Sequence, residues 1–256
     1  MTMRAYAVHP SLSRVPVLVS GGASGIGEAI VRAFAEQNAQ VGFIDIAEAE
    51  GRALAGELRG DGRQVVFVPC DITDTAALKQ AIERIESRHG ATMVLVNNAA
   101  SDDRHPWREV SQDYWDGRIA VNLSHMFFAI QAVAPGMIAA GGGSIVNFGS
   151  FGWMIATPGY PAYATAKAAV HGLTRSFARE LGKDGIRVNT VVPGWVMTKR
   201  QRELWVDEEG ERTIDQQQCL AGRVQPEDIA RMVLFLASDD ASMCSAQSFV
   251  VDGGWS

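Results

Sequence analysis

The sequence predicts a single α/β domain with a doubly wound, seven-stranded parallel sheet and helices on both faces. Short runs of apolar and β-branched residues alternate with longer stretches of helical periodicity along the 256 residues, which is the pattern of repeated strand–helix–strand units. The short runs are apolar throughout, as expected of strands that are buried on both faces. No linker rich in Pro, Gly or Ser divides the chain, so we expect one domain over residues 1–256.

Strands and helices are expected to alternate in a regular order. The strands are predicted at 15–20, 40–45, 64–68, 92–97, 144–150, 186–192 and 247–251. The helices are predicted at 26–37, 48–59, 74–88, 111–139, 160–182 and 226–237. Because proline has no backbone N–H, Pro16 is best placed at the first residue of its strand.

The charge and the cysteine content exclude several classes of function. A net charge of −6 gives no attraction for nucleic acid or anionic membranes, so neither is an expected partner. Three cysteines far apart in sequence indicate neither a disulfide framework nor a zinc site, and they fit a reducing cytoplasm. We find no export signal near the start and no apolar run of ~18 residues. His89, His125 and His171 show no metal-like grouping, so no metal is expected.

Ligands of such a fold bind at the carboxyl ends of the strands, and the first of these ends is rich in glycine. The stretch SGGASGIG at 20–27 leads directly into a helical pattern. Glycines at this place let the backbone approach a pyrophosphate at the helix N-terminus, although such a stretch is often only a tight turn. The residues expected to bind a dinucleotide here are Gly21, Ser24, Gly25, Ile26 and Gly27.

An acidic residue, Asp45, ends the second predicted strand. Its carboxylate can accept hydrogen bonds from both ribose hydroxyls of adenosine and would repel a 2′-phosphate. No cation accompanies it at 45–47 or at 20–24, so the sequence favours NAD over NADP. The alternative is that Asp45 only caps the following helix.

The third predicted strand ends in CDITD at 70–74. Asp71 is placed to accept a hydrogen bond from the adenine amino group, with Ile72 beside it at the same site. Thr73 or Asp74 is expected to cap the next helix.

The most specific pattern is YATAK, which places Tyr163 and Lys167 four residues apart on one helix face. Ser150 closes the fifth predicted strand, thirteen residues before the tyrosine. A nearby ammonium stabilises a phenolate and lowers the pKa of a tyrosine from its ordinary value of about 10, and a serine hydroxyl can orient a substrate hydroxyl. The same spacing of Tyr and Lys also occurs on many solvated helices, so by itself it leaves both interpretations open.

With these motifs together, the chain resembles the short-chain dehydrogenase/reductase (SDR) family over essentially its full length. The glycine turn matches that family's TGxxxGIG with Ser20 in place of threonine, and NNAA matches its NNAG with Ala100 in place of glycine. PGWVMT at 193–198 matches its PGxxxT segment. The resemblance implies a Rossmann fold and a catalytic tetrad formed by Asn122, Ser150, Tyr163 and Lys167.

The resemblance also implies a role for each matching residue. Tyr163, as a phenolate, would take the proton of a substrate hydroxyl while hydride passes from the same carbon to NAD. Lys167 would lower the pKa of Tyr163 and bind the nicotinamide ribose, Ser150 would hold the reacting oxygen, and Asn122 would anchor a water in the proton relay. The other positions implied to contact the cofactor are Asn98, Ala99, Pro193, Val196 and Thr198.

Within this family, segments such as SDDRH (101–105), NFGS (147–150) and QCLAGR (218–223) are similar to those of bacterial aldose 1-dehydrogenases of the D-xylose and D-galactose dehydrogenase type. That similarity implies oxidation of the anomeric carbon of a free aldose, such as D-galactose, L-arabinose, L-fucose or D-xylose, to an aldonolactone. Polar and aromatic side chains near the nicotinamide suit a polyhydroxylated ring better than an acyl chain. The candidates for sugar contact are Ser101, Asp102, Asn147, Ser150, Trp153, Tyr160 and Trp195.

Other interpretations stay open at this point. The charged residues of 101–105 could form ion pairs with one another or with a neighbouring subunit, and Trp153 could simply pack beneath a lid. The substrate could belong to a polyol or secondary alcohol dehydrogenase or to a 3-oxoacyl reductase, although no cationic patch for a phosphopantetheine carrier is evident. A non-catalytic NAD-binding module is a further alternative, against which the complete tetrad speaks.

Two remaining segments carry weaker expectations. The charged segment 195–220 has spaced apolar residues, among them Leu204, Trp205 and Ile214. It predicts one or two amphipathic helices that form a substrate lid, or else a solvated surface helix. The C-terminal VDGGWS resembles the family's tail, which implies a homotetramer by analogy.

Overall fold

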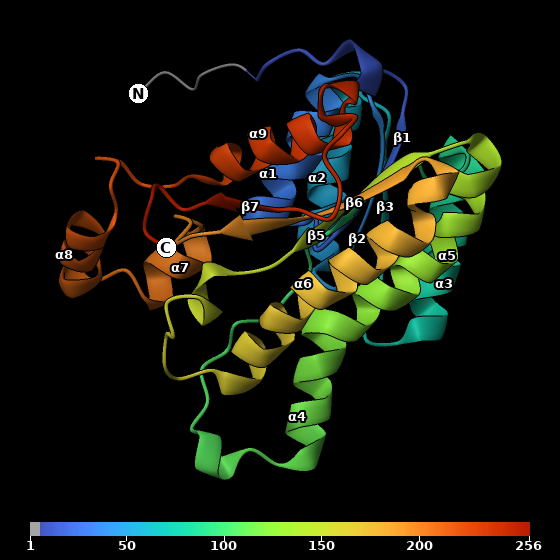
Figure 1. Ribbon diagram of the computed structural model, residues 1–256. Helices are drawn as coiled ribbons and strands as arrows, with labels where there is room; N and C mark the ends of the chain where they lie inside the picture. Colours follow the sequence, from blue (N-terminus) through green and yellow to red (C-terminus); the bar gives the residue numbers. More distant parts are fainter. Residues whose placement is uncertain (1–5) are drawn as a thin grey trace.

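One seven-stranded parallel sheet forms the centre of the computed structural model, which describes residues 6–256. The first five residues, part of the stretch in which no export signal is expected, lie outside this range. The strand order is β3-β2-β1-β4-β5-β6-β7 (Figure 1), and the sheet confirms the predicted fold class. The strands are β1 Pro16–Ser20, β2 Gln40–Asp45, β3 Val65–Pro69, β4 Val94–Asn97, β5 Gly143–Phe148, β6 Ile186–Pro193 and β7 Ser248–Val251.

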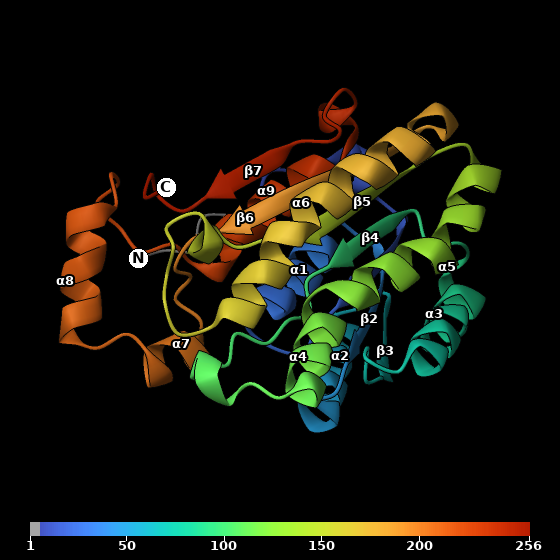
Figure 2. The same ribbon diagram turned by 60° about the horizontal axis from the view of Figure 1, so that its bottom comes forward.

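Helices cover both faces of the sheet (Figures 1 and 2). On one face, α1, α2 and α9 pack with the strands through side chains such as Phe34, Leu54 and Val233. On the other face, α3, α5 and α6 contribute Ile82, Ile130 and Ala178 to a second buried cluster. The helices are α1 Gly25–Glu36, α2 Glu48–Gly60, α3 Thr75–His89, α4 Gln112–Ile119, α5 His125–Ala140, α6 Pro161–Leu181, α7 Lys199–Leu204, α8 Glu208–Gln217 and α9 Pro226–Ala237.

The strand boundaries agree with the sequence prediction to within two residues at each end. Pro16 is the first residue of β1, where its missing N–H breaks no internal ladder. β5 ends at Phe148 rather than Ser150. Ser150 therefore stands in the turn beyond the strand, at the N-cap of a short 3₁₀ helix.

The helix predicted over 111–139 is interrupted in the structure. α4 is followed by one turn of π-helix, Ala120–Ser124, and then by α5. The interruption is visible in the hydrogen bond from the His125 N–H to the Ala120 carbonyl, five residues back. A π-turn accommodates one residue more than an α-turn and is frequent at functional sites.

By length and composition alone, the segment Gln112–Ala140 is apolar enough to cross a membrane. Met126, Ile130 and Met137 are nevertheless buried in the protein core. The core helix of a globular domain has the same composition, so the segment is weak evidence for a membrane span.

The direction of strand succession reverses at β1, which lies between β2 and β4. Here the connecting helices leave the sheet on opposite faces, so a crevice opens beyond the carboxyl ends of the strands. The register aligns Ser20 with Asn97 and Asn97 with Asn147. The ends of three neighbouring strands therefore meet at one place.

The lid segment 195–220 connects β6 to α9. It contains two helices, α7 and α8, as its apolar spacing predicts. In Figure 2, α7 lies beside the carboxyl ends of the strands, whereas α8 stands apart from the sheet.

Candidate active site

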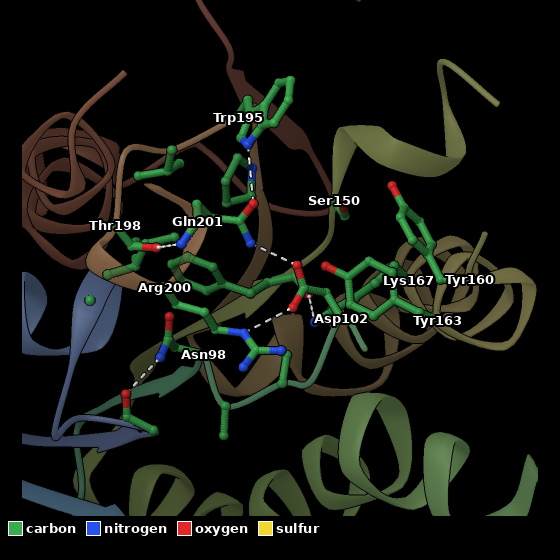
Figure 3. Close-up of a pocket in the computed structure, with 18 of the residues that line it drawn as sticks. Asn98, Asp102, Ser150, Tyr160, Tyr163, Lys167, Trp195, Thr198, Arg200 and Gln201 are labelled. Atoms are coloured by element: carbon green, nitrogen blue, oxygen red, sulfur yellow. Dashed lines mark hydrogen bonds and ion pairs between the residues drawn. The ribbon is translucent and has the colours of Figure 1, made fainter. Parts of the chain in front are cut away.

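A cavity of about 1110 Å³ lies at the carboxyl ends of the strands. Its walls come from the glycine turn, the ends of the central strands, the start of α6, the lid segment and the C-terminal Trp255, and Figure 3 shows part of them. The volume is at the upper end of small-molecule sites, which suits two ligands that lie next to each other. All fifteen residues predicted to bind the cofactor, Tyr163 and Lys167 included, line this cavity.

The glycine turn brings backbone unusually close to backbone. Gly21 has a φ of +67°, and a Cβ on it would lie 2.8 Å from the Cα of Ala99. A Cβ on Gly27 would overlap the carbonyl oxygen of Gly21. Only glycine fits these positions, so the turn and the free N–H groups at the start of α1 form a cradle of the kind that holds a pyrophosphate.

A hydroxyl and an amide connect this turn to β4. Ser20 Oγ accepts hydrogen bonds from the backbone N–H groups of Asn98 and Ala99, at 3.1 and 3.2 Å. Asn98 Nδ2 donates to the carbonyl oxygens of Ser20 and Gly21, at 3.0 Å each. Ser20 thus supplies the hydroxyl group that a threonine would supply at this position. Ala100 is exposed and does not belong to the described non-glycine residues with positive φ, so its methyl group causes no backbone strain.

Asp45 faces the cavity and also holds the turn. Its Oδ2 accepts a hydrogen bond from Ala23 N, and its Oδ1 accepts one from Ala47 N, both at 2.9 Å. The N-cap of α2 is Ala47, not Asp45, and it makes no side-chain cap, so the alternative interpretation of Asp45 as the N-cap is wrong. A carboxylate has about four acceptor sites, which leaves room for two further donors.

The end of β3 separates the two acidic residues by role. Asp71 lines the cavity with Ile72, and its Oδ1 accepts hydrogen bonds from the backbone and the hydroxyl of Thr73. Asp74 caps α3 by accepting from the backbone N–H groups of Ala76 and Ala77. Of the two candidates for the cap, the structure selects Asp74.

The side chains of Ser150, Tyr163 and Lys167 meet in this cavity (Figure 3). The first turns of α6 carry Tyr163 and Lys167 on one face, with the lysine Nζ 5.8 Å from the centre of the tyrosine ring. Lys167 is 1% exposed, and its Nζ donates to the Phe148 carbonyl oxygen at 2.8 Å. The i,i+4 spacing therefore produces a buried ammonium behind the tyrosine, as predicted.

Burial dominates the electrostatics of this pair. It raises the pKa of Tyr163 above the ordinary value, against which a hydrogen bond with Ser150 acts in the opposite direction. The Asp102 carboxylate raises the pKa of Tyr163 further, and the Arg104 guanidinium lowers it. Burial also lowers the pKa of Lys167 to about 7. The net direction for Tyr163 is opposite to the expected lowering, because desolvation of the phenol outweighs its favourable neighbours.

Asn122 lies outside the cavity lining and is fully buried in the π-turn. Its Oδ1 accepts from Ser101 N at 3.0 Å, and its Nδ2 donates to the carbonyl oxygens of Ser101 and Arg118 at 3.1 and 3.0 Å. The side chain is thus committed to anchoring the loop that follows β4.

The loop 101–105 alternates between two roles, as an extended chain does. Asp102 and Arg104 line the cavity. The alternate residues Ser101 and Asp103 bind each other and Arg118 instead. The hydrogen bond from Ser101 holds the pKa of Asp103 below its ordinary value. His105 braces the loop against the segment that precedes α6, since its backbone N–H donates to the Gly159 carbonyl at 2.8 Å.

Three of the seven sugar-contact candidates do not reach the cavity. Ser101 is consumed in the brace described above. Asn147 is fully buried within the sheet, where it accepts from Asn97 Nδ2 at 2.9 Å and donates to Thr174 Oγ1 at 3.0 Å. Trp153 is partly exposed and packs edge-on against His171. The candidates that do line the cavity are Asp102, Ser150, Tyr160 and Trp195.

Arg104, Gln201 and Trp255 also line the cavity, and the last two were not singled out from the sequence. Arg104 lies over the Tyr160 ring at 3.9 Å, and Gln201 hydrogen-bonds both Asp102 and Trp195. Trp255 packs near Trp195, with 6.2 Å between ring centres and a tilt of 52° between the ring planes. A charged residue within SDDRH was a visible signal for Arg104, whereas nothing in the sequence pattern distinguished Gln201 from its polar neighbours.

The described residues contain no group of three or more side chains suited to hold a metal ion. Burial, with the Lys167 charge as a second cause, lowers the pKa of His125 to about 3. This histidine is therefore a neutral residue of the core.

Comparison with known proteins agrees with this site. A family model described as enoyl-(acyl carrier protein) reductase matches residues 21–256. The chain is 50% identical over 249 residues to a D-xylose 1-dehydrogenase of Caulobacter vibrioides, which covers 97% of this chain and 98% of that protein. It is 45% identical over 246 residues to the "Probable galactose dehydrogenase GalD" of Rhizobium meliloti, covering 96% of each.

Solved structures with a similar fold cover nearly the whole chain. A blue fluorescent protein from a metagenomic library, in complex with NADPH, has a TM-score of 0.88 at 34% identity and covers 96% of this chain and 99% of that chain. The 3-oxoacyl-[acyl-carrier protein] reductase of Brucella melitensis has a TM-score of 0.90 at 33% identity and covers 99% of this chain and 97% of that chain.

The fold and the site define a dinucleotide-dependent oxidoreductase that acts on CH–OH groups. The Ser–Tyr–Lys arrangement and the glycine turn, together with these relatives, identify the family within this class. It belongs to the short-chain dehydrogenase/reductase family.

Proposed function

We propose that the protein oxidises the anomeric carbon of a free aldose to the aldonolactone, with NAD as hydride acceptor. The observation that carries the proposal is the composition of the cavity wall. There a carboxylate, Asp102, and two aromatic residues, Tyr160 and Trp195, line the same cavity as Tyr163. A carboxylate that accepts hydrogen bonds from hydroxyl groups, combined with apolar ring planes, suits a sugar. The names of the relatives from Caulobacter vibrioides and Rhizobium meliloti support the same substrate class.

Each catalytic side chain has a distinct task in this reaction. Tyr163 takes the proton of the anomeric hydroxyl, and Ser150 holds that oxygen in place through its own hydroxyl. Lys167 supplies the positive charge that favours the phenolate. Bound NAD supplies the nicotinamide ring that accepts the hydride. Asn122 acts as a positioning residue, because it fixes Ser101 and thereby the loop that carries Asp102.

The adenosine end of the cavity supports NAD over NADP. The cations that line the cavity are Arg104, Lys167, Lys199 and Arg200, and all of them come from the catalytic helix, the lid segment or the loop 101–105. None stands beside Asp45, where a 2′-phosphate would have to lie. A phosphate at this place would meet a carboxylate without a compensating charge.

Replacing Asp45 with asparagine is expected to shift cofactor use toward NADP. The Asp45→Asn variant removes the negative charge but keeps an acceptor for the turn. We expect the ratio of kcat/KM for NADP to that for NAD to rise roughly 10- to 100-fold, the range of one hydrogen bond to a charged group. The exposed Asp61→Asn variant, at the end of α2, is the matched control. A wild-type enzyme that already prefers NADP would contradict the role of Asp45.

The substrate class can be tested directly by NAD reduction over a panel of aldoses, polyols and 3-hydroxyacyl thioesters. We expect turnover of pentoses or hexoses with a free anomeric hydroxyl and none of the thioesters, because a wall with Asp102, Tyr160 and Trp195 suits a polyhydroxylated ring better than an acyl chain. Turnover of a polyol with silence on every aldose would overturn the proposal in favour of a polyol dehydrogenase. The 36% identical D-threitol dehydrogenase of Mycolicibacterium smegmatis makes that arm of the panel worthwhile.

A further inference from the structure

Gln201 of α7 connects two walls of the cavity through its single amide group. Its Oε1 accepts a hydrogen bond from the indole N–H of Trp195 at 3.1 Å, and its Nε2 donates to Asp102 Oδ2 at 2.7 Å (Figure 3). Because both ends of the amide are in use, neither the amide nor the carboxylate is free to rotate. The lid segment thereby sets the orientation of a carboxylate that belongs to a different loop.

The Asp102 carboxylate retains acceptor capacity in this arrangement. Its other oxygen, Oδ1, receives only a long 3.4 Å contact from Arg200 Nε, because Arg200 is directed mainly at Asp103, at 2.6 Å. A carboxylate has about four acceptor sites, so at least one remains for a ligand in the cavity. The Asp102 side chain is 24% exposed, which leaves it accessible from that side.

Arg104, another cation that lines the cavity, is held by other groups. The Arg104 guanidinium lies over the ring of Tyr160 at 3.9 Å and over the ring of Trp205 at 5.0 Å, and it donates to the Pro158 carbonyl at 3.1 Å. These contacts stack the guanidinium between the start of α6 and the lid. It contributes charge to the cavity but does not consume the Asp102 carboxylate.

The position of Asp102 relative to Tyr163 limits what it can recognise. In Figure 3 the Asp102 side chain lies between Gln201 and Tyr163, and its charge acts on the tyrosine hydroxyl. Tyr163 and Ser150 hold the reacting oxygen. Asp102 lines the same cavity as these two hydroxyls, so its carboxylate is an acceptor for a further hydroxyl of a substrate held there.

We propose that Asp102, oriented by Gln201, is the specificity-determining residue for the hydroxyl group adjacent to the oxidised carbon. The inference rests on the proposed function, and for an aldose this group is the hydroxyl on C2. The Asp102 carboxylate accepts a hydrogen bond from this hydroxyl, and Gln201 is the positioning residue. The site therefore recognises a vicinal pair of hydroxyls rather than a single alcohol.

The test compares kcat/KM for the best aldose of the panel with that for its 2-deoxy analogue and its C2 epimer. We expect the wild-type enzyme to favour the aldose over both by about 10- to 100-fold, as for one hydrogen bond to a charged group. In Asp102→Asn and Gln201→Leu the preference is expected to fall to less than about one third of the wild-type ratio. Gln216→Leu, on the exposed surface of α8, is the matched control and keeps the wild-type ratio.

The ratio separates recognition from mere structural damage. A general loss of folding or of catalytic power lowers kcat/KM for the aldose and the 2-deoxy sugar alike, and that result in both variants would reject the inference. Equal use of the two sugars by the wild-type enzyme would also reject it while leaving the aldose dehydrogenase proposal intact. Failure of every aldose in the panel would instead overturn the proposed function, and this inference with it.

Discussion

Replacement of Tyr163 by phenylalanine is expected to lower kcat for sugar oxidation by about 10²- to 10⁴-fold, the range of general acid–base catalysis. The change removes one oxygen from a side chain whose ring keeps its packing against Tyr160, at 5.1 Å between ring centres. Steady-state kinetics measures the loss, and a fluorescence titration with NAD measures binding.

The cofactor affinity of Tyr163→Phe should stay close to that of the wild type, because the glycine turn and Asp45 are untouched. Tyr114→Phe is a matched control, since that hydroxyl hydrogen-bonds His105 at 3.0 Å and lies outside the cavity lining. Wild-type turnover by Tyr163→Phe would exclude the tyrosine as the base.

Replacing Lys167 with methionine should have the second largest effect. We expect kcat/KM to fall roughly 10- to 100-fold, since one charged contact is lost. The ammonium stabilises the phenolate, so its removal raises the pKa of Tyr163 and moves the acid limb of the pH–kcat profile to higher pH. Lys79→Met, an exposed position with a 4.0 Å ion pair to Glu83, should leave the profile unchanged. An unshifted profile for Lys167→Met would contradict the role of the lysine.

The Lys167→Met substitution lowers activity, but its effect on the free energy of unfolding is expected to be more favourable at low pH. Burial lowers the pKa of Lys167 to about 7, against about 10.4 in an unfolded chain. Between these two values the unfolded protein binds the extra proton, so the wild type gains stability as the pH rises. The variant lacks this gain. Its free energy of unfolding relative to the wild type should therefore be more favourable at pH 6 than at pH 9, as denaturant titrations can measure.

Much of the fold follows from local patterns. The strands are apolar throughout because helices cover both faces, so their positions were visible to within two residues, and the parallel topology followed from the alternation with helices. The π-turn was not visible. The sequence VNLSH is as compatible with an α-helix, and the interruption is stabilised by hydrogen bonds between the Asn122 side chain and the backbone of Ser101 in a distant loop.

Ser150, Tyr163, Lys167 and the residues of the glycine turn were predicted to share one site because each belongs to a motif with fixed spacing on a strand end or a helix face, and the structure brings them together in one cavity. For the sugar-contact candidates, only four of seven side chains line the cavity, because side chains of an extended segment point alternately to opposite sides. Asn147 precedes Ser150 by three residues in an extended run, and its side chain turns into the sheet toward Asn97. Trp255 reaches the cavity only because the tail folds back over Trp195, a long-range contact that no local pattern records.

The single turn of π-helix at Ala120–Ser124 divides one continuous helical segment into two phases. One additional residue rotates all that follows by about 100° relative to an uninterrupted α-helix, so α5 presents a different face than it would in a continuous helix. In Figure 1 the axis of α5 is also bent away from that of α4. Asn122 lies where the phase changes. The number of residues in this segment is therefore constrained as strictly as their identity, because deletion of one residue within the turn would restore the continuous helix and rotate Asn122 away from Ser101.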